Sequence, residues 1–294
     1  MMRQRTALLL ALWTLLFPVR AGSAGKEVLS LLTVDPALSL MVRFIGGPYV
    51  ETDSGAFWDV RDELRCSRGR VLGDKLADRP LVALDEEQYR LFLERARGSR
   101  KKRPLSQADL TRPRLVFLYP GGTGQNGLTD FYADPARLPF TAQKVMNLLC
   151  ELAPERVSYF QRRLGEFCAR LRATLISGRA LLSGRQIFCM SPDLVPFLKA
   201  SGCAVSEPSE TDWEQFRLLC RTENPKHAQA LAQPYQEGSL IVMDYTVPQE
   251  IRETLTLWCG ALYMPPPRDE DWLYYLHRWT VTLSSFQKRK TAKK

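Results

Sequence analysis

Few side chains in this sequence are suited to acid-base, nucleophilic or metal-binding chemistry, and they are widely scattered. The chain has two histidines, His227 and His277, so a Ser-His-Asp or Cys-His arrangement would need one of them as its base. Each lies in a helical pattern where surface or packing roles are the more common ones. GxSxG and HExxH, the most frequent signatures of serine hydrolases and zinc proteases, are both absent from the sequence. These residues therefore favour a binding protein over an enzyme.

One glycine motif superficially suggests nucleotide chemistry. Gly122, Gly124 and Gly127 spell GxGxxG directly after an apolar run at 114–119. In a dinucleotide-binding unit these glycines let the backbone approach a pyrophosphate at the start of a helix. Here no helical pattern follows, so we interpret the motif as a turn.

The first 24 residues have the pattern of a secretory signal peptide. Two arginines precede an apolar run at 6–19, and small residues at 21–24 suit signal peptidase. This run is shorter than the roughly 20 residues that span a bilayer. Because no cysteine lies near the cleavage point, a lipid anchor is not expected. We predict an exported, periplasmic protein whose mature chain begins at residue 25.

Composition and charge fit a globular protein that does not bind nucleic acid. The chain has 294 residues, of which 45% are hydrophobic and 25% charged, and a formal net charge of +9. Basic residues concentrate at 95–103 and 288–294. Neither run is interleaved with aromatic residues that could stack on bases, so we interpret them as a solvated loop and a solvated tail.

Hydrophobic patterns predict alternating strands and helices on both sides of one long helix. Before it, strands are expected at 26–34, 81–84 and 114–119, and helices at 37–45 and 86–97. After it, strands are expected at 185–190, 204–205 and 239–243, and helices at 192–200, 225–232 and 270–287. Such alternation is typical of parallel sheets with crossover helices.

The long helix itself is predicted from Pro154 onward, over about 24 residues, because apolar side chains recur there at three- and four-residue spacing. The predicted fold is therefore α/β, with two parallel-sheet lobes joined by one long spine helix. We assign residues 25–150 to an N-terminal lobe, 151–180 to the connecting helix and 181–294 to a C-terminal lobe.

Several short passages occur in an order that matches one known family. The matching residues are 34–36, 45–47, 134–135, 152–155, Tyr159, Leu164, 184–185, 197–202, 240–244 and 272–276. In this order they resemble the metal-binding solute-binding proteins of ABC importers, the zinc and manganese family. The resemblance implies a monomeric periplasmic receptor without catalysis, with a divalent metal ion and an inner-membrane ABC permease as its partners.

The same resemblance implies a metal site of about three histidines and one carboxylate. The corresponding positions here are Asp130, Ser191 and Asp244, with Asp59 or else Asp62 in place of the first histidine. Oxygen donors favour harder cations such as manganese, calcium or magnesium over zinc.

Two neighbouring features bear on that implied site. Cys189 stands beside Ser191 and offers an alternative thiolate ligand, although a cysteine at a strand end is more often simply buried. Where the family commonly has a loop rich in histidine and carboxylates, this chain has the basic run at 95–103, which would repel cations. Both features point to a divergent site.

The expected function is that of an exported solute-binding component of an ABC-type metal importer, with a degenerate ligand site. Zinc or manganese is the implied ligand, and the sequence also allows the alternative that the site binds no metal. The alternative is a scaffold or protein-interaction module that keeps the fold but has lost transport. The seven cysteines form no CxxC pair, and we expect a disulfide bond between Cys220 and Cys259 to be geometrically possible in an exported chain.

Overall fold

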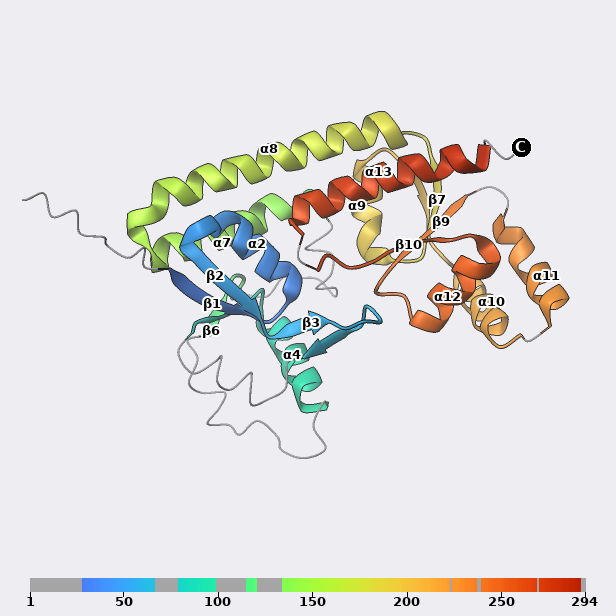
Figure 1. Ribbon diagram of the computed structural model, residues 1–294, viewed down its shortest axis with the longest axis horizontal. Coiled ribbons are helices and arrows are strands. Elements are labelled where there is room, and N and C mark those ends of the chain that lie inside the picture. The colour runs from blue at the N-terminus through green and yellow to red at the C-terminus, as the bar shows by residue number, and fades with distance from the viewer. Residues whose placement is uncertain are drawn as a thin grey trace, which may run out of the picture.

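The computed structural model describes residues 28–66, 79–98, 115–120, 134–222, 224–236, 239–268 and 270–291. In these ranges two four-stranded sheets lie apart along the long axis of the molecule (Figure 1). One long helix runs from beside the first sheet toward the second, and the last helix of the chain packs along it over the second half. The α/β class and the two-sheet architecture predicted from the sequence are therefore confirmed. The GxGxxG motif and Asp130 lie outside the described residues, as does the predicted signal peptide.

The first sheet is built from parallel strands in the order β2-β1-β5-β6. Its strands are β1 (Leu29–Thr33), β2 (Val50–Ser54), β5 (Leu81–Ala83) and β6 (Leu115–Phe117), and its helices are α2 (Pro36–Gly46), α4 (Glu86–Gly98) and α7 (Leu138–Leu152). Asp35 fixes the start of α2 because its Oδ1 accepts from the backbone N–H of Ala37 at 2.7 Å. The helix ends at Gly47, which adopts a φ of +54°.

The second sheet repeats this parallel arrangement in the order β10-β9-β7-β8. Its strands are β7 (Gln186–Cys189), β8 (Ala204–Ser206), β9 (Leu240–Asp244) and β10 (Leu262–Met264), and its helices are α9 (Val195–Ala200), α10 (Glu210–Cys220), α11 (Pro225–Gln236) and α12 (Gln249–Cys259). Short 3₁₀ turns at Gly47–Tyr49, Pro154–Arg156 and Pro192–Leu194 complete the connections.

The long helix is continuous, as predicted. A 3₁₀ turn at Pro154–Arg156 leads into α8 (Val157–Leu182), which has 26 residues and no break. It packs against α7 and α2 of the first half and along α13 (Trp272–Thr291), the last helix of the chain. Its buried side chains, including Phe160, Phe167 and Leu182, belong to a core that also contains strand residues of both sheets.

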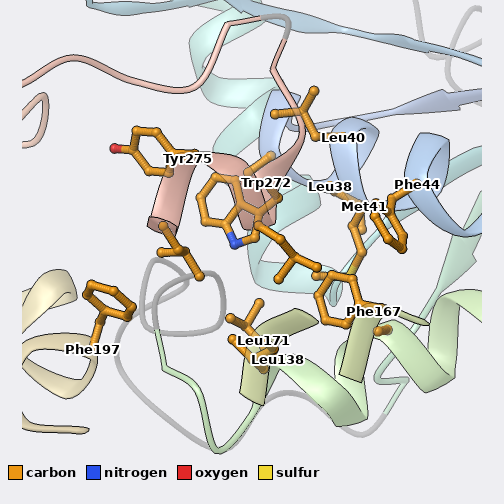
Figure 2. Packing of buried hydrophobic residues seen from close by; sticks show 14 of the residues in the cluster. Leu38, Leu40, Met41, Phe44, Leu138, Phe167, Leu171, Phe197, Trp272 and Tyr275 are labelled. Carbon is orange, nitrogen blue, oxygen red and sulfur yellow. The ribbon is translucent and has the colours of Figure 1, made fainter. Parts of the chain in front are cut away.

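Aromatic side chains fill the centre of this shared core (Figure 2). Phe44 of α2 meets Phe167 of α8 edge to face, with ring centroids 5.5 Å apart. In α13, Trp272 packs on Tyr275 with ring centroids 5.3 Å apart, and both side chains are almost completely buried (Figure 2). Because helices from both halves contribute to one core, the two sheets are held in a fixed relation.

Six elements of the described ranges were not predicted from the sequence. These are β2, β10, α10, α12 and a hairpin of two antiparallel strands, β3 (Ala56–Trp58) and β4 (Leu64–Cys66). The strands of the hairpin have three residues each, which is too short for a visible period-two pattern. In contrast, α10 begins with a capping box between Ser209 and Asp212, a signal that is present in the sequence.

The expected disulfide bond is not formed in the structure. Cys220 is a free thiol whose Sγ lies 3.8 Å from the backbone oxygen of Glu250. Cys259 is instead buried in the core between the second sheet and α10, α11 and α12. Separately, no helix within the described ranges combines the length and apolar character needed to cross a bilayer.

Candidate functional site

Two of the predicted site residues meet at the carboxyl edge of the second sheet. Asp244 ends β9 and Ser191 follows β7, and these parallel strands are neighbours. Side chains at the carboxyl ends of adjacent parallel strands converge on one edge, where open α/β sheets bind ligands. The Oγ of Ser191 donates to Oδ1 of Asp244 at 2.7 Å, and the Asp244 backbone N–H donates to the same Oγ at 2.9 Å.

The Asp244 carboxylate is buried and only partly satisfied. Its residue is 2% exposed, and burial raises its pKa against the lowering effect of hydrogen bonds from Thr246 and Ser191 and of the charge on Arg252. The donors are the Ser191 hydroxyl, the Thr246 hydroxyl and the Thr246 N–H, and all three bind Oδ1. Across the described ranges no hydrogen bond reaches Oδ2, so this oxygen keeps its capacity to bind a ligand.

Cys189 does not present a thiolate to this site. Its side chain is fully buried, and its Sγ donates to the backbone oxygen of Ser191 at 3.2 Å. Burial raises the pKa of the thiol to about 12. At neutral pH the sulfur is therefore protonated, which disfavours it as a metal ligand.

Asp59 is engaged within its own hairpin rather than with Asp244. Its Oδ1 accepts from the backbone N–H of Arg61 at 2.8 Å and of Glu63 at 3.0 Å, and Oδ2 accepts from Nε of Arg65 at 3.0 Å. The hydrogen bond from Glu63 contributes most to lowering the pKa of Asp59. Both oxygens thus hold the turn between β3 and β4, and the structure does not bring Asp59 together with Ser191.

Asp62, the other possible donor in this stretch, joins the hairpin to the second half of the chain. Its Oδ1 accepts from Arg268 at 2.6 Å, and its Oδ2 accepts from the hydroxyl of Tyr263 at 2.7 Å. Arg252 of α12 also binds the Tyr263 hydroxyl and donates to the backbone oxygen of Arg61 at 2.9 Å. We call Asp62, Tyr263, Arg252 and Arg268 the interlobe clasp.

An aromatic pair reinforces this contact next to the Ser191–Asp244 pair. Trp58, at the end of β3, packs on Tyr245, with ring centroids 4.3 Å apart. Tyr245 directly follows Asp244, and burial raises its pKa well above the ordinary value, so its hydroxyl stays protonated. The hairpin therefore delivers an indole ring from the first half of the molecule to the edge of the second sheet.

The residues described do not themselves complete a metal-binding cluster. Within those ranges, no three side chains of histidine, cysteine, aspartate or glutamate gather closely enough to hold an ion. Sequence reasoning missed Tyr263, Arg252 and Arg268, whose roles depend on tertiary contacts. It also missed Thr246, whose role is local: this residue follows Asp244 by two positions, where its hydroxyl and N–H can bond back to the carboxylate.

Comparison with known proteins identifies the fold. No protein-family model matches the sequence, and no curated protein matches it. Among solved structures, the chain is similar to ZnuA with a TM-score of 0.62 and 14% identity, covering 88% of this chain and 99% of that one. It is also similar to a Zn(II)-bound mutant of AdcAII of Streptococcus pneumoniae, with a TM-score of 0.57, 15% identity and coverages of 87% and 98%.

A manganese-bound periplasmic metal-binding protein from Candidatus Liberibacter asiaticus gives the same result. Its TM-score is 0.57 at 9% identity, covering 88% of this chain and 99% of that one. The chain thus shares its fold with ZnuA, AdcAII and this periplasmic metal-binding protein, and the resemblance seen in the sequence is confirmed at the level of the fold.

Proposed function

We propose that this chain is the exported solute-binding component of an ABC-type importer, and that its solute is a divalent metal ion bound at Asp244 and Ser191. In this role the protein acts in the periplasm as a monomer, delivers the ion to a permease in the inner membrane and performs no catalysis. The observation that carries the proposal is the pair Ser191–Asp244, a buried hydroxyl–carboxylate contact at the ligand-binding edge of a sheet in a receptor fold.

Electrostatics support a cation at this position. A carboxylate as buried as Asp244 is costly to ionise unless a positive charge lies close by. The charge of Arg252 lowers its pKa, but this guanidinium donates hydrogen bonds to Tyr263 and to the Arg61 backbone oxygen and not to Asp244. A divalent ion on Oδ2 would place positive charge in direct contact with the carboxylate.

The donor types favour manganese over zinc. Asp244, Ser191 and Asp130, the family-implied position outside the described ranges, all offer oxygen, and Cys189 stays protonated. Carboxylate and hydroxyl oxygens suit hard cations, whereas tight zinc sites use imidazole or thiolate. We therefore expect zinc affinity far below that of a histidine-bearing receptor.

One observation favours a second candidate, a scaffold that keeps the fold without transport. The interlobe clasp ties the hairpin to the second half through Asp62, Tyr263 and Arg268. A receptor that must open and close around its ligand gains nothing from such contacts, whereas a rigid interaction module does. This candidate predicts that no divalent ion binds.

Calorimetric titration of the mature protein with manganese and with zinc tests the proposal. Wild type should bind one manganese ion, and Asp244→Ala should lower the affinity by about a hundredfold or more while the circular dichroism spectrum is unchanged. Ser191→Ala should weaken binding less, because it removes a neutral donor.

A matched control is Glu151→Ala, which removes an exposed carboxylate from α7 far from this edge in sequence. Its affinity for manganese should equal that of wild type. Absence of metal binding by the wild type would favour the scaffold, and tight zinc binding that survives Asp244→Ala would refute the proposed site.

A further inference from the structure

A second polar cavity is lined mainly by residues of the first half of the molecule, together with Arg268 from the second half. Its volume is about 280 Å³, and its lining includes neither Ser191 nor Asp244. One face of α2 forms a wall through Ser39 and Arg43, which are four residues apart, and β2 forms another through Thr52 and Ser54. Residues four apart in a helix and two apart in a strand lie on the same face, so these four polar side chains line the same cavity.

Two hydroxyls of this wall are buried without good hydrogen bonds. Ser39 is 4% exposed and Thr52 is 6% exposed. Their oxygens lie 3.5 Å apart, and Thr52 Oγ1 is also 3.5 Å from the backbone oxygen of Asp53. Normal hydroxyl hydrogen bonds are about 2.7–2.8 Å long. Since buried polar groups are usually satisfied, these hydroxyls are poised to donate to something else.

The charges around the cavity leave one cation without a counter-ion. Asp53 is neutralised by Arg79 at 3.0 Å, and Arg268 is paired with Asp62 at 2.6 Å. In the described part of the chain no carboxylate approaches the guanidinium of Arg43, which is exposed at the last turn of α2. The local field at the cavity is therefore positive.

Apart from the carboxylate of Asp53, which is paired with Arg79, two further polar side chains of the lining add donors. The Ser54 Oγ already accepts from the backbone N–H of Ala56 at 3.2 Å, which leaves its own hydrogen to donate. Nε1 of Trp58, another lining residue, is buried and finds no acceptor within the described ranges. A wall of hydroxyl, indole and guanidinium donors calls for a ligand that accepts hydrogen bonds and carries negative charge.

We propose that this cavity binds a small oxyanion, with Arg43 supplying the charge and the hydroxyls of Ser39 and Thr52 supplying hydrogen bonds. A water molecule occupies about 30 Å³ of liquid, so the cavity holds an anion the size of phosphate or a short carboxylate together with a few waters. The lining of this cavity contains neither Ser191 nor Asp244, although Trp58, which lines it, packs on Tyr245 beside that pair.

Calorimetry of the mature protein with inorganic phosphate, in a buffer free of other oxyanions, tests the proposal. Wild type should bind one phosphate. Arg43→Met should weaken binding by about tenfold or more, because it removes a charged donor, and Thr52→Val by a smaller factor. Arg172→Met is the matched control, since it removes an exposed helical arginine of α8 and should leave phosphate affinity unchanged.

Parallel titrations with acetate and succinate show whether the cavity prefers a carboxylate or phosphate. Either preference is consistent with the same hydrogen-bond donors and with the proposal. Wild type that binds none of the three anions at millimolar concentration would overturn the proposal. So would an equal loss for Arg172→Met and Arg43→Met, because that result means diffuse surface binding. Arg43→Met should keep its manganese affinity, so failure of the anion site and failure of the metal site are separable.

Discussion

The interlobe clasp makes a quantitative prediction about Asp62. This residue has a φ of +59° and a side chain that is 15% exposed, and it binds Tyr263 and Arg268 through separate oxygens. The ion pair with Arg268, whose side chain is 48% exposed, is worth about 0.5–1 kcal/mol after solvent screening. The hydrogen bond from the Tyr263 hydroxyl to a charged acceptor contributes about 1.5–3 kcal/mol.

Two substitutions separate these contributions. Asp62→Asn keeps an acceptor for Tyr263 and tolerates the left-handed backbone, so it should cost about 1 kcal/mol, mainly the lost ion pair. Asp62→Ala also removes the acceptor and strains the backbone, so it should cost about 3 kcal/mol.

Urea unfolding measures both losses in the free energy of unfolding, and hydrogen exchange shows where they act. The amides of Arg61 and Glu63, which donate to Asp59, should exchange faster in Asp62→Ala than in wild type. If Asp62→Ala is as stable as wild type and these amides stay equally protected, the hairpin is held by something other than the clasp.

Three further predictions concern the first half and the core. Gly47→Ala should destabilise the fold by more than about 2 kcal/mol in urea unfolding, because φ is +54° and a Cβ would lie 2.0 Å from the hydroxyl of Tyr159. Phe167→Ala should cost about 3–5 kcal/mol by the same assay, since the ring is fully buried against Phe44. Burial raises the pKa of Asp35, so its protonated form stabilises the folded state at acid pH, and that contribution is lost as the pH rises through the folded pKa. Asp35→Asn, which still caps α2, should therefore gain stability over wild type as the pH increases from 4 to 7; a gain that is larger at pH 4 would contradict this sign.

The features predicted correctly are those with a clear local sequence pattern, either a long apolar periodicity or an apolar run between turn residues. The spine helix α8 repeats apolar residues over 26 positions, and the buried strands β1, β7 and β9 stand between clear turn signals. The adjacency of Ser191 and Asp244 was implied by the family resemblance and agrees with a parallel pairing of β7 with β9. Apart from that pairing, these features do not depend on knowing a distant contact.

The features that escaped prediction depend on tertiary contacts. Strands of three residues, as in the hairpin, have no period to detect. Asp62 meets Tyr263 about two hundred positions away, and nothing local to either residue indicates this pairing. From the sequence alone, an arginine in a helix is expected at the surface. Arg252 of α12 is instead buried, and it donates hydrogen bonds to the Tyr263 hydroxyl and to the backbone oxygen of Arg61.

The most direct test of the central claim is anomalous X-ray diffraction from crystals of the mature protein grown with manganese. We expect one strong anomalous peak within bonding distance of a carboxylate oxygen of Asp244 and close to Ser191 Oγ, at the carboxyl ends of β7 and β9. That peak should be absent from Asp244→Ala crystals of the same form. A wild-type map with no manganese at this edge, or with manganese only on surface carboxylates, would contradict the assignment of this chain as a metal receptor.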